Sequence, residues 1–170
     1  MQPTVGRFPS TDIRVSERAR GTLRLTTFAD TGQSLVVDER DVPALLDLDF
    51  QTKLPYSGTW GSNFSLRWSG YLLAERPGDY RLEASFDDGC RIFLDGDLLL
   101  ADWLVGSIRT RSVAIALEQG WHQIQIDYLQ YTAEAHLSLR IAPEPEPPVA
   151  VPVRAFASWA ESPLALATAP

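Results

Sequence analysis

The dipeptide Asp87-Asp88 is the part of the chain whose residue types are best suited to chemistry. Two neighbouring carboxylates repel each other, and binding a divalent cation is one common way to remove that repulsion. Ca²⁺ takes about six to eight oxygen ligands, which acid-rich loops can supply. The alternative is a polar turn, in which the aspartate oxygens accept backbone N–H groups and Gly89 adopts a positive φ. The residues alone leave both interpretations open.

The other candidates for catalysis lack the partners that catalytic sites need. Two adjacent aspartates within a strand point to opposite faces, so they cannot flank one bond as acid and base unless they leave the strand. His122 and His136, the two histidines, fall in strand patterns without a nucleophile elbow or a metal-binding helix motif. Cys90 shares a strand face with Ile92 and Leu94, which predicts a buried, unreactive thiol. We therefore expect no active site in this chain, and any catalysis would belong to another domain.

Strands are the elements that position these residues, because apolar and polar side chains alternate through most of the chain before residue 143. Asp95-Gly96 is the strongest hairpin signal, since both residues tolerate the positive φ of a type I′ turn. The pattern predicts an all-β fold, an antiparallel β-barrel or sandwich, with one helical turn at residues 43–48. The predicted strands are residues 21–28, 64–74, 81–86, 90–94, 97–101, 110–117, 121–131 and 136–141.

The composition describes one globular domain with a negative net charge. The 170 residues carry 15 Lys and Arg against 22 Asp and Glu, a formal charge of -7, which disfavours nucleic acid as a partner. Residues 79–102 and 38–49 hold most of the clustered acids. A single cysteine excludes an internal disulfide. No apolar run reaches the length of a membrane helix, so we expect no membrane insertion by this chain, and its polar start lacks a signal-peptide stretch.

Four ordered motifs resemble the PA14 domain family. They are residues 64–72 (FSLRWSGYL), 78–82 (GDYRL), 85–96 (SFDDGCRIFLDG) and 117–128 (LEQGWHQIQIDY). Residues 23–29 are similar to that family's first strand, and 135–140 to its last. With the proline-rich stretch after residue 142, this divides the chain into an N-terminal extension (1–19), a PA14-like β domain (20–142), a proline-rich linker (143–152) and a C-terminal tail (153–170).

The resemblance implies a β-barrel or sandwich of the kind appended to adhesins, glycosidases, toxins and glycosyltransferases. It also implies a site, because several members bind glycans through a calcium ion held by two consecutive aspartates joined by a cis peptide. Here the matching residues are Asp87 and Asp88. Oxygens of a later loop complete the metal site, and the matching residues are Gln130, Tyr131 and Glu134. This loop lacks the asparagine or aspartate often found there, so Glu134 or main-chain carbonyls are expected to substitute.

The aromatic residues extend this hypothesis to the ligand, because pyranose faces stack on exposed rings. Trp60, Trp103 and Tyr131 are the candidate stacking residues, whereas Trp68 lies in a strand motif and is expected in the core. The predicted function is a calcium-dependent carbohydrate-binding module for a sugar with vicinal hydroxyls. We expect it in an extracellular, periplasmic or cell-surface protein of greater length. The alternative is a structural or protein-docking module, in which the aspartates only brace a turn or hold a structural ion.

Overall fold

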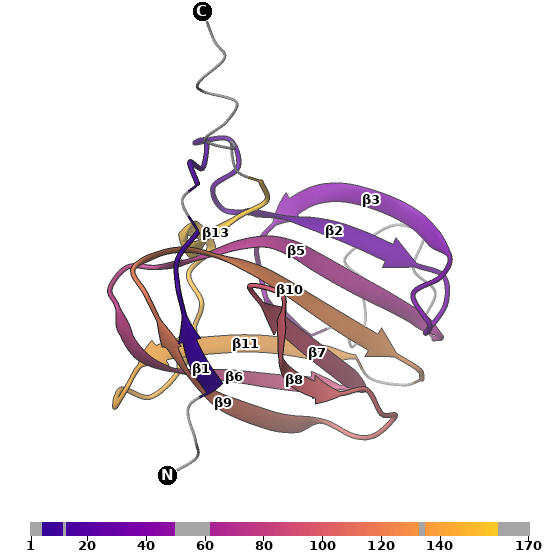
Figure 1. The fold of residues 1–170 in the computed structure, drawn as a ribbon. Coiled ribbons are helices and arrows are strands. Elements are labelled where there is room, and N and C mark those ends of the chain that lie inside the picture. Colours follow the sequence, from indigo (N-terminus) through magenta and orange to yellow (C-terminus); the bar gives the residue numbers. More distant parts are fainter. Residues whose placement is uncertain (1–4, 12, 50–61, 133–134, 160–170) are drawn as a thin grey trace, which may run out of the picture.

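The computed structural model describes residues 5–11, 13–49, 62–132 and 135–159, which form two packed β-sheets (Figure 1). In the described residues β1 and β9 form the one parallel pair of strands, and the other pairs are antiparallel. The six-stranded sheet contains, in order, β1 (Val5–Phe8), β9 (Arg109–Leu117), β6 (Gly78–Asp87), β11 (His136–Pro143) and β12 (Val149–Ala150), with β4 (Asp47–Asp49) also paired to β11. The seven-stranded sheet contains β3 (Val36–Pro43), β2 (Thr22–Phe28), β5 (Phe64–Ala74), β10 (Gly120–Gln130), β7 (Gly89–Leu94) and β8 (Asp97–Asp102), with β13 (Phe156–Ala157) paired to β5.

The all-β fold and the predicted strands are confirmed. The hairpin between β7 and β8 turns at Asp95 and Gly96, whose φ angles of 49° and 89° are those the type I′ prediction requires. The sequence did not predict β3, because its acidic residues mask the strand pattern. Arginines on the same sheet neutralise those acids, since Arg24 lies 2.9 Å from Asp41, and Arg40 lies 3.2 Å from Asp38.

The helical turn expected at residues 43–48 is wrong. The segment runs from the end of β3 through unassigned residues 44–46 into β4, and alternate side chains are buried, Ala44 and Leu46 among them. One hydrogen bond is local, from the Leu45 N–H to the Pro43 carbonyl (2.8 Å), but two others reach distant segments: the Ala44 N–H donates to the Gly21 carbonyl (2.9 Å), and the Leu46 carbonyl accepts from the Leu139 N–H (2.8 Å). Pairing with two distant segments satisfies the backbone without a helix.

The core lies between the inner faces of the two sheets. Trp68 is fully buried there, as expected, and so is Cys90. Burial raises the pKa of the Cys90 thiol, aided by the nearby charges of Asp127 and Asp102, so the unreactive protonated form persists. In the described part of the chain, no helix is both long and apolar enough to span a membrane.

Residues 143–157, which the sequence divides between a linker and a tail, pack against the sandwich. β12 pairs with β11, and the short 3-10 helix η1 (Val153–Ala155) leads into β13, which pairs with β5. Phe156 is fully buried in the main core. At the other end of the chain, β1 pairs with β9 and Ala19 is buried. The packed unit therefore extends beyond residues 20–142, because Phe156 fills space between the sheets.

His122 joins two turns at one end of the sandwich. It is fully buried, with Nδ1 2.8 Å from Asp95 Oδ2 and Nε2 2.9 Å from the Glu118 carbonyl oxygen. Burial lowers the pKa of His122, but the hydrogen bonds to Asp95 and Glu118 together raise it above its ordinary value. Both neighbours are acceptors, so the ring fits them best when both its nitrogens carry protons.

Stability should therefore fall as the pH rises. The protonated His122 contributes fully below its unfolded-state pKa of about 6.5, and this contribution is lost as the pH rises through the higher folded-state pKa. We expect the stability difference between wild type and His122→Gln to shrink as the pH rises above about 6.5, measured by urea unfolding. The half-buried His136 provides the control variant His136→Gln. The same pH dependence in both variants would contradict the assignment.

Candidate functional site

The two aspartates lie where the chain passes from one sheet to the other. β6 ends at Asp87, β7 begins at Gly89, and the peptide bond between Asp87 and Asp88 is cis. Gly89 does not have the positive φ that the turn interpretation predicts. It is needed for close approach instead, because a Cβ at Gly89 would lie 3.1 Å from the Asp102 carbonyl oxygen and 3.2 Å from the Trp103 Cα. The Asp-Asp-Gly motif therefore places the aspartates against the strand end at residue 102.

Asp88 connects two loops through its carboxylate. Its side chain is buried, with 3% exposure. Oδ1 accepts the Gly106 N–H at 2.9 Å, and Oδ2 accepts the Tyr131 N–H at 2.6 Å. The part of the turn interpretation in which aspartate oxygens accept backbone N–H groups is confirmed for Asp88. Each carboxylate oxygen has a second lone pair, so these bonds do not prevent Asp88 from also binding a cation.

Tyr128 lies beneath the pair and contacts the backbone of Asp87. Its hydroxyl lies within hydrogen-bonding reach of the Asp87 carbonyl oxygen and of Gln130 Oε1, the latter at 2.6 Å. Burial raises the pKa of Tyr128, and the negative charges of Asp87 and Asp88 raise it further, so the hydroxyl remains a donor. Gln130, which the sequence proposes as a metal ligand, is fully buried with its side-chain oxygen bonded to Tyr128.

Arg109 holds the loop that supplies the first donor to Asp88. This loop, residues 103–108, connects β8 to β9. The Arg109 guanidinium binds both carboxylate oxygens of Asp102, at 2.9 and 2.7 Å, and the carbonyls of Leu104 (2.8 Å) and Ser107 (3.2 Å). The hydrogen bond with Asp102 is the main cause that raises the pKa of Arg109. A Cβ at Gly106 would lie 3.0 Å from Arg109 Nη1, so this glycine lets the loop close over the arginine.

Sequence reasoning missed Arg109, because its partners lie in a loop that has no motif. We expect Arg109→Lys to release the loop, since an ammonium group cannot reproduce the planar fork. The variant should lose about 1–3 kcal/mol of the hydrogen-bond free energy that holds the loop. Because Gly106 lies in this loop, hydrogen exchange of its amide should then be faster by about tenfold or more. Arg111→Lys is the matched control, because Arg111 makes one 3.0 Å contact with Asp102 and is half exposed. Equal exchange in both variants would contradict the role of Arg109.

The structure places the predicted aromatic and loop residues in different surroundings. Trp103 is half-buried, and the Arg91 guanidinium lies 3.9 Å from its ring centroid, so one ring face is occupied. Tyr131 is exposed beside Asp88, and its carbonyl accepts the Asn63 N–H at 3.0 Å. Trp60 and Glu134 lie outside the described residues. The structure thus brings Tyr131 and Trp103 to the loops around the aspartates.

The ligands that a cation would need are partly present. Two carboxylates offer up to four oxygens, and the hydrogen bonds of Asp88 to Gly106 and Tyr131 bring together two loops whose main-chain carbonyls could add ligands. Among the described residues, no group of three or more His, Cys, Asp or Glu side chains is placed to hold a metal ion. Carboxylates are the hard oxygen donors that Ca²⁺ accepts, so an ion here would need carbonyl, water or ligand oxygens to complete its shell.

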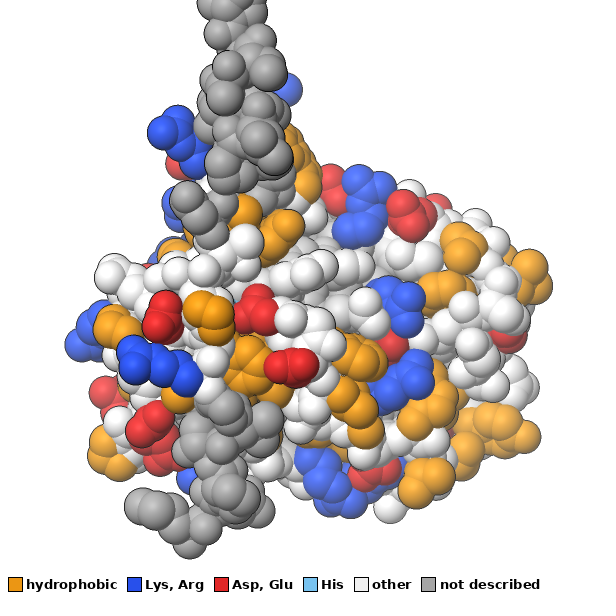
Figure 2. Space-filling view, in the orientation of Figure 1, with side chains coloured by type: hydrophobic (Ala, Val, Ile, Leu, Met, Phe, Trp, Pro, Cys, Tyr) orange, Lys and Arg blue, Asp and Glu red, His pale blue; other side chains and the backbone are white. Residues whose placement is uncertain are grey.

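An apolar rim and a shallow hollow border the site. Leu104, Val105 and Ile108 expose 70%, 58% and 56% of their surface. The hollow, of about 320 Å³, is lined by this loop together with Asp102, Arg109 and Arg111. A ligand at the aspartates would meet both apolar groups and hydrogen-bonding groups. On the side shown in Figure 2, charges of both signs and hydrophobic side chains are interspersed.

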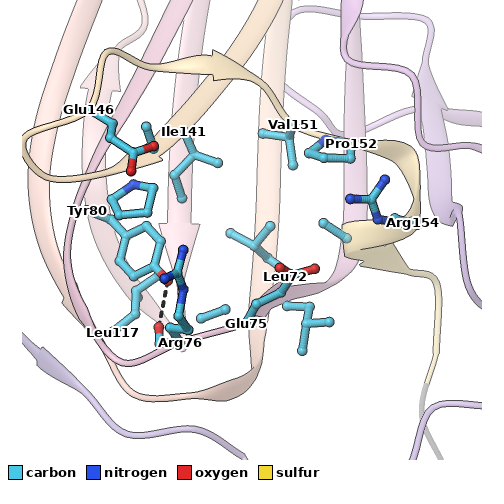
Figure 3. A pocket seen from close by; sticks show the side chains of 15 residues that line it. Leu72, Glu75, Arg76, Tyr80, Leu117, Ile141, Glu146, Val151, Pro152 and Arg154 are labelled. Carbon is cyan, nitrogen blue, oxygen red and sulfur yellow. Dashed lines mark hydrogen bonds between the residues drawn. The ribbon is translucent and has the colours of Figure 1, made fainter.

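A second pocket lies at the opposite end of the sandwich, where β5 ends and β6 begins. It has a volume of about 210 Å³, and Figure 3 shows Leu72, Leu117 and Ile141 around it with charged groups towards its edge. The Tyr80 hydroxyl there donates to the Arg76 carbonyl at 2.6 Å. This pocket shares no residue with the aspartate site, and its lining is largely aliphatic.

Asp127 is the most buried charge on the outer face of the seven-stranded sheet. Its side chain is 0% exposed and receives hydrogen bonds from Arg67 Nε (2.8 Å) and Nη2 (3.0 Å) and from Arg91 Nη2 (3.1 Å). Gln33 Oε1 accepts from both arginines, at 2.9 and 2.8 Å. Arg91 in turn stacks on Trp103. This network links the sheet face to the loop beside the aspartates.

The chain is similar in sequence and in fold to several known proteins. The family model of the PA14 domain matches residues 21–148. The anti-sigma-I factor RsgI3 of Acetivibrio thermocellus is 30% identical over 95 residues, which cover 55% of this chain and 15% of that relative. An anti-sigma factor domain-containing protein from Clostridium clariflavum has a TM-score of 0.75 at 20% identity, covering 94% of this chain and 53% of that one. The epithelial adhesin 9 A domain from Candida glabrata, in complex with Galβ1-3GlcNAc, has a TM-score of 0.69 at 12% identity, covering 88% and 95%.

Proposed function

The chain belongs to the PA14 domain family, and from that premise we propose that it is a non-catalytic carbohydrate-binding module of a larger cell-surface or exported protein. The observation that carries the proposal is the position of Asp87 and Asp88 between two loops, with Asp88 tied to both. The likeness to an adhesin domain that holds a glycan supports the ligand class. The chain spans only 15% of the RsgI3 sequence, which supports a module within a longer protein.

We propose that Ca²⁺ is bound by the carboxylates of Asp87 and Asp88, with main-chain oxygens near Tyr131 as further ligands. Calcium supplies a Lewis-acidic centre that vicinal hydroxyls of a sugar can coordinate. The residues of the chain position the site: Asp88 fixes both loops, Arg109 shapes the 103–108 loop, and Tyr131 offers an exposed ring beside the carboxylates. Stacking on that ring would orient the sugar. Glu134 remains a proposed ligand from the sequence.

Isothermal titration tests this proposal. Glucose, mannose and fucose, each added with calcium and with EDTA, should give binding heat with at least one sugar in calcium only. Asp87→Asn should weaken that binding by about tenfold or more, which corresponds to about 1.4 kcal/mol, and leaves both backbone bonds of Asp88 in place. Asp97→Asn is the matched control, because Asp97 is exposed in the β7–β8 hairpin. Sugar binding that neither EDTA nor Asp87→Asn weakens, with no further calcium-dependent heat, or no heat across a broad glycan array in calcium, would overturn the proposal.

A protein-docking module is the second candidate, and the exposed Leu104, Val105 and Ile108 favour it. Three large apolar side chains on one loop are an unusual cost for a surface that contacts only water. In this case the aspartates serve to hold the loop. If this candidate is right, the wild type binds no sugar in titration, and Val105→Ser abolishes capture of a protein partner. The carbohydrate proposal instead expects sugar binding by the wild type.

A further inference from the structure

The outer face of the seven-stranded sheet carries a groove that the aspartate site does not use. Two adjoining hollows, of about 310 and 190 Å³, share Gln123 as a lining residue. We call the combined feature the sheet groove. Besides Gln123, it is lined by Arg24, Ser69, Gly70, Tyr71, Ser158 and Trp159 in the first hollow, and by Phe93, Gly96 and Gln125 in the second.

The sheet groove runs across the strands. Ser69 of β5 is in register with Arg24 of β2 and with Gln125 of β10, and Gln125 is in register with Phe93 of β7. These four residues therefore lie side by side on four neighbouring strands, a span of about 14 Å at the usual strand spacing. That length suits an extended chain better than a single small molecule.

An apolar cluster and a charge network lie on the two sides of the groove. On one side the small cluster of Ala19, Trp121 and Ala157, with Ile13 and Val15 packed on it, covers the sheet. On the other side, two residues further along the strands, lies the network of Asp127 with its two arginines. The groove therefore lies between two ordered features of the fold.

Apart from Arg24, the polar groups that line the groove are neutral, and several are available for a ligand. Among the residues that the structure describes, the Gln123 amide and the Ser69 and Tyr71 hydroxyls make no hydrogen bonds. Gln125 donates its amide N–H to Asp127 at 3.2 Å, which directs that side chain and leaves its oxygen as an acceptor. These groups donate and accept without charge, so they match hydroxyl groups rather than phosphates or cations.

Aromatic rings flank these neutral groups. Phe93 and Tyr71 are half-buried and Trp159 is 43% exposed, so all three offer apolar faces to a ligand. The nearest charges are already compensated, because Arg24 is paired with Asp41 at 2.9 Å and Asp95 with His122 at 2.8 Å. Rings that stack, combined with amides and hydroxyls that donate and accept, are the chemistry that recognises a sugar chain.

We propose that the sheet groove is a second, calcium-independent binding site for a neutral oligosaccharide, which lies across β5, β10 and β7. Phe93 and Trp159 stack on sugar rings near the two ends, and Gln123 and Ser69 bind hydroxyls between them. Phe93 is five residues along the chain from Asp88, about 16 Å at strand rise. The groove shares the ligand class of the proposed function but none of its residues, so either site can fail alone.

Isothermal titration with the hexasaccharides of glucose, mannose and xylose, in EDTA, tests this inference. The intact chain should bind at least one of them. Phe93→Ala and Gln123→Ala should each weaken that binding by about fivefold to tenfold, and the double variant should lose it. Asp87→Asn should leave it unchanged. Ser112→Ala, at an exposed position of the six-stranded sheet, is the matched control, and circular dichroism confirms that each variant is folded.

Four results would overturn the proposal. The first is no binding of any hexasaccharide in EDTA by the intact chain. The second is binding that the double variant retains, which would place the ligand elsewhere. The third is a change in sedimentation coefficient caused by the double variant without sugar, which would identify the groove as a contact between copies of the chain. Loss of binding in Asp87→Asn alone would instead favour the aspartate site as the only sugar site.

Discussion

Asp88→Ala is expected to lower the free energy of unfolding by about 2–4 kcal/mol and to abolish calcium-dependent sugar binding. The buried carboxylate accepts backbone N–H groups from Gly106 and Tyr131. Truncation leaves two donors without their acceptor, and each such loss costs about 1–3 kcal/mol where water cannot replace it. Urea unfolding followed by tryptophan fluorescence measures the effect. Asp97→Ala is the control, and should change the stability by less than about 0.5 kcal/mol.

Asp88→Asn separates the two roles of the residue. The amide keeps one acceptor oxygen and so preserves one loop contact, but it removes the charge that a cation needs. We expect a smaller stability loss than for alanine, together with the full loss of calcium-dependent binding. A variant that keeps calcium-dependent binding after losing this charge would show that Asp88 only braces the loops.

Asp127→Ala is the second change with a large expected effect, a destabilisation of about 2–4 kcal/mol. Removing a fully buried carboxylate leaves Arg67 and Arg91 facing each other without their shared partner. The largest stability losses known for broken buried ion pairs are not expected here, because both arginines are about one-third exposed. Urea unfolding at neutral pH measures the loss.

The matched control for Asp127 is Asp41→Ala. Asp41 pairs with Arg24 at 2.9 Å on the same sheet, but both side chains are exposed by more than a third. Exposed pairs contribute about 0–1 kcal/mol because water and salt screen them. Equal losses in the two variants would show that burial adds nothing to the Asp127 network.

Local patterns made the strands predictable, and the family resemblance implied the cis peptide bond between Asp87 and Asp88. Alternation in residues 121–131 becomes β10, and Asp95-Gly96 forms the expected turn. Alternation fails where charge hides it, as in β3, whose acids are balanced by Arg24 on a neighbouring strand. It also fails for residues 43–48, because their backbone partners at Gly21 and Leu139 lie far away in sequence.

The aspartate site was only half predictable for the same reason. The motif identifies Asp87 and Asp88, but nothing near them indicates that Gly106 and Tyr131 supply the hydrogen-bond donors. The turn interpretation gives Gly89 a positive φ, whereas its role is to let the backbone at residues 102–103 approach. Arg109 has no signal in the sequence beyond its charge. Contacts between loops depend on the assembled fold, and local spacing does not encode them.

The most direct test of the central claim is a crystal structure of the chain grown with calcium and soaked with a sugar that binds in titration. We predict an ion whose oxygen ligands include the carboxylates of Asp87 and Asp88 at about 2.3–2.6 Å, with two neighbouring sugar hydroxyls in its shell. A sugar bound elsewhere, with no ion between these two carboxylates, would contradict the account.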